Sequence, residues 1–209
     1  SEQENARSDS QKLQIVATIF PEYDWIKEIL GDQAENVDLT LLLGNGTDMH
    51  SFQPTMEDIL KVSTCDLFIY VGGESDSWVA DALKGAGNPD RKAINLMDVL
   101  GDQVKEEELV EGMQEEDGHT HEEEHTHDDD LEYDEHVWLS LKNASLFCDT
   151  IASSLADADP EHSRLYQQNA EAYEEKLAAL DQEYQTSVEK SRSKTLLFAD
   201  RFPFRYLID

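Results

Sequence analysis

The chain has 209 residues, 47 of them acidic and 16 basic, and its formal net charge at pH 7 is −31. With 39% hydrophobic residues it has enough apolar side chains for a core, which excludes a wholly disordered acidic protein, and its length corresponds to one or two domains. A surface this negative repels nucleic acid and anionic lipid and attracts cations, so we expect no nucleic-acid partner.

Residues 1–12 are polar and are interpreted as a flexible leader. Such a leader fits a secreted chain whose signal peptide has been removed, a lipoprotein without its acylated cysteine, or a cytosolic protein. No stretch approaches the ~20 apolar residues that a membrane span requires. Cys65 and Cys148 lie in apolar contexts and are interpreted as buried small hydrophobic residues, with a disulfide left open.

The first half of the chain alternates apolar runs with helical patterns. The β-branched and apolar runs predict four strands, at 13–20, 37–43, 66–71 and 93–97. Helices are predicted between them, at 21–30, from Thr55 onward and at 75–83. This order is typical of a mostly parallel sheet with helices on both faces, whose ligands bind at the carboxyl ends of the strands. The loop 44–54, which carries His50, follows the second predicted strand.

A low-complexity acidic segment comes next, with no Lys or Arg from Glu106 to Glu135, and it predicts a mobile loop at about 105–130 because it cannot bury enough apolar surface to fold. Its histidines form two His-x-His pairs, His119, His121, His125 and His127. Imidazole suits Zn²⁺, Cu²⁺ and Ni²⁺, and carboxylates add oxygen ligands. We interpret the cluster as an accessory metal-attracting site; a solvated charge run or a cloning tag is the alternative.

We expect ordered structure again at 131–139, after the mobile loop, and a helix is predicted at 141–155. A second helical pattern begins at Pro160 and runs to about residue 191, which at 1.5 Å per residue gives a rod of roughly 45–50 Å. Because one small lobe does not need so long a helix, we interpret it as a spine between two lobes. A strand predicted at 195–199 has no partner after it, which suggests that the rest of a second lobe is missing.

Two histidines outside the acidic loop are candidate metal ligands. His50 follows a glycine-rich loop, and His136 stands between an acidic pair and an apolar run. Each alone is more often a structural histidine, but the metal-attracting loop before His136 weakens that interpretation. Asp134 and Glu135 either orient His136 or are exposed. His162, in the first turn of the long helix, is expected to be solvated.

Four sequence blocks carry a resemblance to a known family. TDMHSFQPTMED (47–58) resembles the D-x-H-x-x-x-P loop of the zinc and manganese solute-binding proteins of ABC importers, and DEHVWLSLKNA (134–144) resembles their D-P-H-x-W-L-x-P-x-N-A motif. CDLFIYVGGESDSW (65–78) is similar to their A-D-L-hydrophobic-G-x-x-x-E-x-W stretch, and DPEHSRLYQQNAEAY (159–173) to the start of their lobe-linking helix. The acidic His-rich loop resembles that of the zinc-specific members.

The resemblance implies a first β/α lobe at 13–158, a linking helix at 159–192 and the start of a second lobe at 193–209. It implies that His50 and His136 are the metal ligands of the first lobe, in a cleft between two lobes. Family members take another His from the second lobe, but Arg201 stands at that position here, and Arg cannot ligate a metal. Asp200, next to it, is a substitute candidate. Two histidines need water, Asp200 or a second-lobe residue to reach four-coordination.

The implied function is capture of a divalent transition metal outside the cytoplasm, in the periplasm or at the cell surface with or without a lipid anchor, and its delivery to an ABC permease in the membrane. We expect Zn²⁺, with Mn²⁺ as the alternative, a monomer, and no enzymatic activity. Because each imidazole must be neutral to bind metal, affinity should fall below about pH 6.5. Three other functions stay open: a zinc buffer or chaperone that uses the His-rich loop, a surface adhesin, and a metallohydrolase, against which the chain has no HExxH motif.

Overall fold

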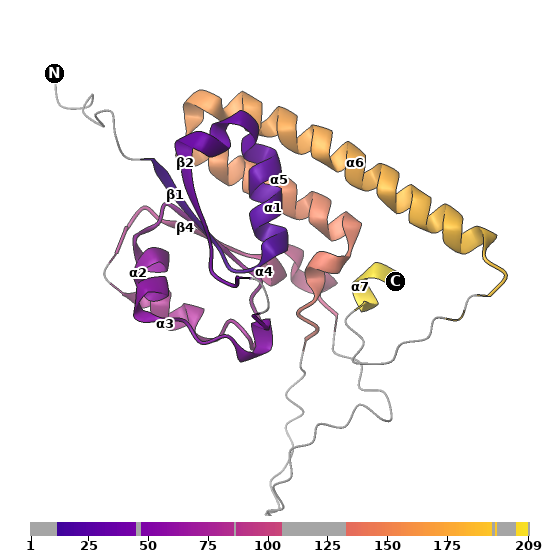
Figure 1. Ribbon diagram of the computed structural model, residues 1–209, viewed down its shortest axis with the longest axis horizontal. Coiled ribbons are helices and arrows are strands. Elements are labelled where there is room, and N and C mark those ends of the chain that lie inside the picture. Colours follow the sequence, from indigo (N-terminus) through magenta and orange to yellow (C-terminus); the bar gives the residue numbers. More distant parts are fainter. Residues whose placement is uncertain are drawn as a thin grey trace, which may run out of the picture.

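Four parallel strands form the centre of the fold. The computed structural model describes residues 12–44, 47–85, 87–105, 133–193, 195 and 204–208. The strand order is β2-β1-β3-β4 (Figure 1). The strands are β1 Leu13–Ala17, β2 Val37–Leu41, β3 Leu67–Tyr70 and β4 Lys92–Asn95. The predicted α/β fold class, a mostly parallel sheet flanked by helices and followed by a long helix, is confirmed.

Some predicted features lie outside the described residues. They are the leader up to residue 11, residues 106–130 of the predicted mobile loop with His119, His121, His125 and His127, all but residue 195 of the strand predicted at 195–199, Asp200 and Arg201. The division of the chain into a first lobe, a linking helix and the start of a second lobe therefore stays a prediction.

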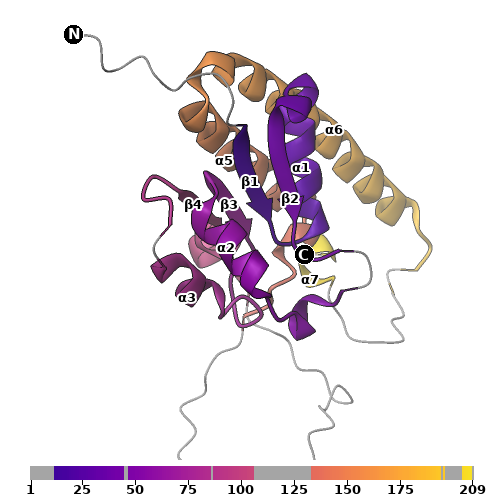
Figure 2. The ribbon, with the colours of Figure 1, turned by 60° about the vertical axis from the view of Figure 1, so that its left-hand side comes forward.

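Helices cover both faces of the sheet (Figures 1 and 2). One face packs against α1 (Phe20–Leu30) and α5 (Leu141–Ala158), and α6 (Ser163–Lys190) lies over these two helices. The other face packs against α2 (Met56–Thr64) and α3 (Val79–Lys84). Alternation along the strands explains the two layers. Ile15 and Ala17 of β1 belong to the larger core with α1 and α5, whereas Val16 belongs to the smaller core with α2 and α3.

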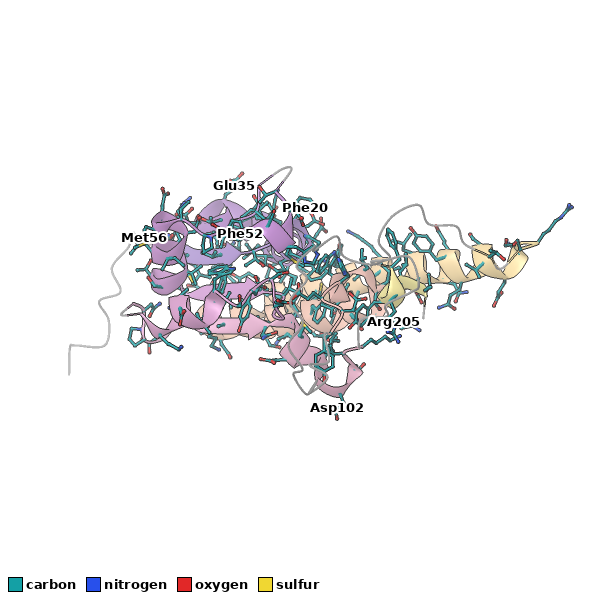
Figure 3. All side chains as sticks on the ribbon, turned by 90° about the horizontal axis from the view of Figure 1, so that it is seen from below. Phe20, Glu35, Phe52, Met56, Asp102 and Arg205 are labelled. Carbon is teal, nitrogen blue, oxygen red and sulfur yellow. The ribbon has the colours of Figure 1, made fainter. Side chains whose placement is uncertain are left out.

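The helix α6 is 28 residues long, which corresponds to about 42 Å. Its first part, which packs against α1 and α5, buries Tyr166, Ala170 and Leu177. Its last part leaves Tyr184 and Val188 more than half exposed, and Figure 3 shows this end extending beyond the rest of the described chain. The predicted long helix is thus present, preceded by a short 3-10 turn over Pro160–His162.

Local sequence signals explain where helices begin and end. Thr55 caps α2 as predicted: its hydroxyl accepts from the Asp58 N–H, and the Asp58 carboxylate accepts from the Thr55 N–H. Gly31 ends α1 with a φ of 53°, a backbone conformation that glycine adopts without strain. The third helix starts at Val79, later than the predicted residue 75, because side chains bind the backbone of the preceding turns.

The strand order places a crevice at the carboxyl ends of the strands. Since β1 pairs with β2 on one side and with β3 on the other, the connections diverge beside β1, and open α/β sheets bind their ligands at such a point. The loop from β2 to α2, the turns after β3 and the segment at 133–140 reach this edge. None of the helices among the described residues is long and apolar enough to cross a bilayer.

The two cysteines are buried and free, as their apolar contexts predict. Cys65 lies in the smaller core and Cys148 in the larger one, so they stand on opposite faces of the sheet. Burial raises the pKa of each thiol to about 12, and neither is a thiolate at neutral pH. Their role is packing.

Candidate metal centre

His50 is presented by a short turn after β2. The turn covers Met49–Ser51, and the Asp48 carboxylate begins it by accepting a 3.2 Å hydrogen bond from the His50 N–H. The His50 side chain is 44% exposed, and its Nδ1 lies 3.0 Å from Ser75 Oγ in the turns after β3. The ring is therefore held on one side and open to solvent on the other.

His136 is held by its own segment. Its Nδ1 lies 2.7 Å from Asp134 Oδ1, and the same oxygen accepts a 2.9 Å bond from the His136 N–H. Because an ionised carboxylate only accepts hydrogen bonds, Asp134 fixes the ring proton on Nδ1 and leaves Nε2 to bind a metal. The arrangement is the usual outer support of a metal-binding histidine. The prediction that Asp134 orients His136 agrees with this geometry.

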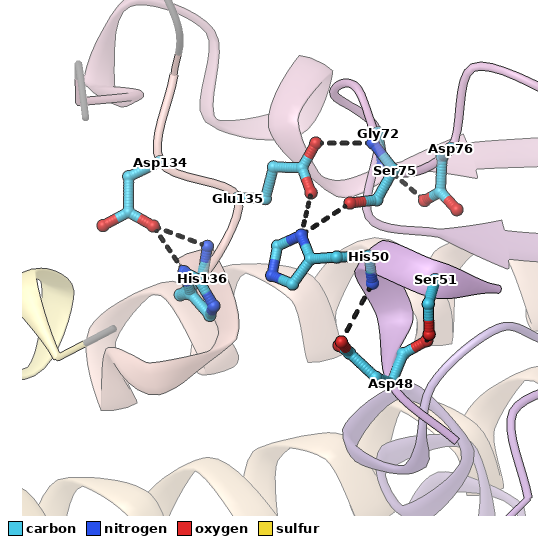
Figure 4. Close-up of polar contacts among 9 residues, drawn as sticks. All are labelled: Asp48, His50, Ser51, Gly72, Ser75, Asp76, Asp134, Glu135 and His136. Carbon is cyan, nitrogen blue, oxygen red and sulfur yellow. Dashed lines mark hydrogen bonds and ion pairs between the residues drawn. The ribbon is translucent and has the colours of Figure 1, made fainter. Parts of the chain in front are cut away.

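The two rings face each other across the crevice (Figure 4). Their centroids are 5.6 Å apart and their planes are inclined by 56°. With a Zn–N bond of about 2.0–2.1 Å, each centroid stands roughly 3.2 Å from the ion, so two tetrahedral imidazole ligands have centroids about 5.2 Å apart. The observed separation of His50 and His136 is close to that value, so the two rings can share one ion after a small adjustment.

Buried carboxylates lie behind this pair. Glu135 is 7% exposed, and its Oε1 accepts a 2.8 Å bond from the Ser75 N–H. Asp76 accepts a 2.9 Å bond from the Gly72 N–H, and burial raises its pKa to about 6, with a further rise from the charge of Glu135. Burial also raises the pKa of Glu22, on α1, and the charge of Asp76 adds to that rise. The crevice thus has an acidic floor.

An apolar wall adjoins the histidines. A hollow is lined by residues from the start of α1, the end of β2 and both histidine segments, among them Phe20, Leu43, Met49 and Trp138. The Trp138 ring centroid is 5.3 Å from that of His136. An apolar surround lowers the local dielectric and strengthens the interaction of the ligands with a bound cation.

The described residues provide two candidate metal ligands, His50 and His136, which are fewer than a complete zinc site needs. Among them, no group of three or more His, Cys, Asp and Glu side chains lies so that it could hold one ion. Asp200 and the four loop histidines are outside the described residues. His162 is apart from the pair: its Nδ1 lies 2.8 Å from Asp159 Oδ2, so it is paired as well as partly solvated.

The sequence did not indicate the partner of Glu135, and it did not indicate three other polar residues of the site. Glu135 was expected to orient His136 or to be exposed, but it is buried and its Oε2 is 3.9 Å from Nδ1 of His50. Ser75, Asp76 and Glu22 were not singled out. The signal for Glu22 was its position in the first turn of a predicted helix that follows a buried strand, where a carboxylate caps the N-terminus.

The chain thus has an α/β fold with two neighbouring histidines at the carboxyl edge of its parallel sheet. The sequence matches the family described as ZnuA, zinc-uptake complex component A, periplasmic, over residues 15–209. The chain belongs to this family.

Individual relatives agree with the assignment. The chain is 34% identical to the zinc-binding lipoprotein AdcA of Streptococcus pneumoniae serotype 4 over 203 residues, covering 97% of this chain and 38% of AdcA. It is 34% identical over 193 residues to the high-affinity zinc uptake system protein ZnuA of Bacillus subtilis, covering 92% and 57%. It matches the crystal structure of the metal-dependent lipoprotein YcdH from Bacillus subtilis with a TM-score of 0.73 and 28% identity, covering 94% and 63%. The chain thus spans less than two thirds of each relative.

Proposed function

We propose that this chain is the first metal-binding lobe, with its linking helix, of an extracytoplasmic solute-binding protein that captures Zn²⁺ and delivers it to an ABC import permease. The observation that carries the proposal is the pair of imidazoles, His50 and His136, with centroids 5.6 Å apart and with each Nδ1 engaged by a neighbouring side chain. The zinc-binding names of the relatives support the choice of metal. Their description as lipoproteins supports a place at the cell surface or in the periplasm.

The open geometry suits transport. A carrier has to release its ion, so two ligands at a crevice rim suit it better than a closed four-ligand cage. Two nitrogen ligands favour Zn²⁺, although Mn²⁺ is the competing cargo. Water, Asp200 or a residue of a second lobe completes the coordination in this proposal. The histidines at 119, 121, 125 and 127 act as an accessory collector that raises the local metal concentration. No catalytic step is assigned.

Calorimetric titration of metal-free protein with Zn²⁺ and Mn²⁺ tests the proposal. We expect a tight site for Zn²⁺ that weakens at least about 100-fold in His50→Ala and in His136→Ala, because each removes one of two nitrogen ligands. His162→Ala is the matched control and should bind as the unaltered protein does. If both ligand variants keep full affinity, the site is elsewhere and the proposal is wrong.

A further inference from the structure

Glu135 is buried beside the metal centre with one oxygen unsatisfied. The residue is 7% exposed, and among the described residues Oε2 has no hydrogen-bond partner. That oxygen lies 3.9 Å from Nδ1 of His50. A buried carboxyl oxygen without a hydrogen-bond partner is unfavourable, so its place beside His50 calls for a compensating role.

The backbone after β3 is shaped around this carboxylate (Figure 4). Ser75 bridges the two side chains, since its N–H donates to Glu135 Oε1 at 2.8 Å and its Oγ lies 3.0 Å from His50 Nδ1. Gly73 has a φ of 77°, and a Cβ built there would stand 2.4 Å from Glu135 Oε1. Only glycine leaves room for the carboxylate at this point. Glu135 thus ties together the loops after β2 and β3 and the segment of His136.

The chemistry of the two neighbours of His50 differs. A serine hydroxyl both donates and accepts, so Ser75 alone is compatible with a proton on Nδ1 or on Nε2 of His50. An ionised carboxylate only accepts, so Glu135 favours a proton on Nδ1. With the proton on Nδ1, the lone pair of Nε2 is available for a metal.

We propose that Glu135 is a positioning residue for His50: through its negative charge and its contact with Ser75 it keeps the His50 proton on Nδ1 and presents Nε2 to the metal. Its oxygen approaches the Nδ1 side of the ring, which is not the ligating side, and Glu135 is in no three-residue ligand group among the described residues. Consecutive carboxylates therefore serve different histidines, Asp134 for His136 and Glu135 for His50. This inference rests on the proposed metal-capture function.

Glu135→Gln tests the proposal, because it keeps the size of the side chain and an acceptor for the Ser75 N–H but removes the charge. Nitrogen-15 NMR of metal-free protein at a pH where imidazole is neutral reads the tautomer of each histidine. We expect His50 to lose its preference for the Nδ1–H form while His136 keeps it. Zinc affinity should fall about 10- to 100-fold. Glu161→Gln, on the exposed turn before α6, is the matched control.

Further readouts separate positioning from ligation and from folding. The absorption spectrum of the Co²⁺-loaded protein should keep its shape in Glu135→Gln; a changed coordination spectrum would show a ligand and overturn the proposal. Glu135→Asp should restore the His50 tautomer in part. If Glu135→Gln does not fold, Ser75→Ala is measured instead. We expect His50 to stay in the Nδ1–H form in this variant, because Glu135 is retained. A loss of zinc affinity as large as that in His50→Ala would contradict the inference.

The outcomes also distinguish this inference from the function on which it rests. If Glu135→Gln keeps both the tautomer and the affinity while His50→Ala loses binding, the positioning role is wrong and metal capture stands. If His50→Ala and the unaltered protein bind zinc equally, metal capture at this pair fails, and the role of Glu135 fails with it.

Discussion

Glu22 joins the end of β1 to the beginning of α1. Its Oε2 accepts bonds from the Thr18 N–H at 2.8 Å, the Thr18 hydroxyl at 3.0 Å and the Ile19 N–H at 3.2 Å. The side chain is fully buried, and its pKa is raised chiefly by that burial and also by the nearby charge of Asp76. Protonation of one of these two acids relieves the repulsion between them, so acid should favour the folded state here.

Asp76→Asn tests whether acid favours the folded state through this pair of buried carboxyl groups. The pKa of Asp76 is about 6 in the folded chain against 3.8 as its ordinary value, so the folded state holds a proton that the unfolded state releases between about pH 4 and 6. Stability from this group is present at low pH and is lost as pH rises through 6. Asparagine stays neutral and still accepts from the Gly72 N–H. The variant should match the unaltered protein at pH 4 and exceed it by on the order of 2–3 kcal/mol at pH 7.

Urea unfolding of metal-free protein at pH 4, 5, 6 and 7 measures the difference. Asp81→Asn, on the exposed side of α3 and 87% exposed, is the control and should show no such trend. A stability difference that does not change with pH would contradict the interpretation of Asp76 as a buried, repelled acid.

The short helix α7 (Arg205–Ile208) docks beside the segment that carries His136. The Tyr206 hydroxyl accepts from the Lys105 N–H at 2.8 Å and donates to the Asp134 carbonyl at 3.0 Å. The Asp134 N–H in turn donates to the Lys105 carbonyl at 2.9 Å. One buried side chain therefore joins the two backbone segments that flank the acidic segment 106–132, next to the residue that supports His136.

Tyr206→Phe removes that hydroxyl and keeps the ring. We expect a loss of about 1–3 kcal/mol in the free energy of unfolding, because buried backbone groups lose a partner. Amide hydrogen exchange should quicken at Lys105 and Asp134, and zinc affinity should fall severalfold as Asp134 becomes less constrained. Tyr184→Phe, on the exposed end of α6, is the control. Unchanged exchange at both amides would show that α7 does not hold these segments.

Short-range sequence signals predicted where most helices and strands lie, but they predicted the ends of these elements less well. Runs of apolar and β-branched residues identified the four strands, and the capping-box spacing of Thr55 and Asp58 identified the start of α2. The helical period identified the long helix, because burial of one face leaves a pattern in the sequence. It missed α4 (Leu96–Leu100), because five residues are too few to show a helical period. It also placed α3 too early, since side chains distant in sequence bind the turns at 74–78, and no local pattern records that.

For the whole molecule, the sequence indicated the fold class and the histidine pair, but not the acidic floor beneath it. His50 and His136 stand in blocks that resemble known metal-binding motifs, whereas the role of Glu135 depends on the direction of its side chain in an irregular segment. Parallel strands bring remote loops to one edge, and the contact between Glu135 and His50 arises only there. A local sequence pattern does not predict such contacts between distant segments.

Deleting residues 118–130 tests whether the loop histidines and the His50–His136 pair bind zinc separately. We expect the weak, multiple zinc-binding phase to disappear while the tight site keeps its Kd within about threefold, because the His50–His136 pair does not depend on the loop for ligands. Replacement of the four loop histidines by serine at constant charge is the matched control for electrostatic attraction. Isothermal titration reads both phases. A chain that loses nearly all zinc binding on deletion would instead be a buffer based on the loop.

The two histidines are brought together only by long-range contacts. Along the chain they are separated by α2, β3, α3, β4 and α4, so their approach depends on assembly of the sheet. Contacts between segments so far apart form after the local ones, since loop-closure entropy opposes them until the core is in place. The unfolded or newly made chain therefore offers cations only scattered, weak ligands. The paired imidazoles form late in folding.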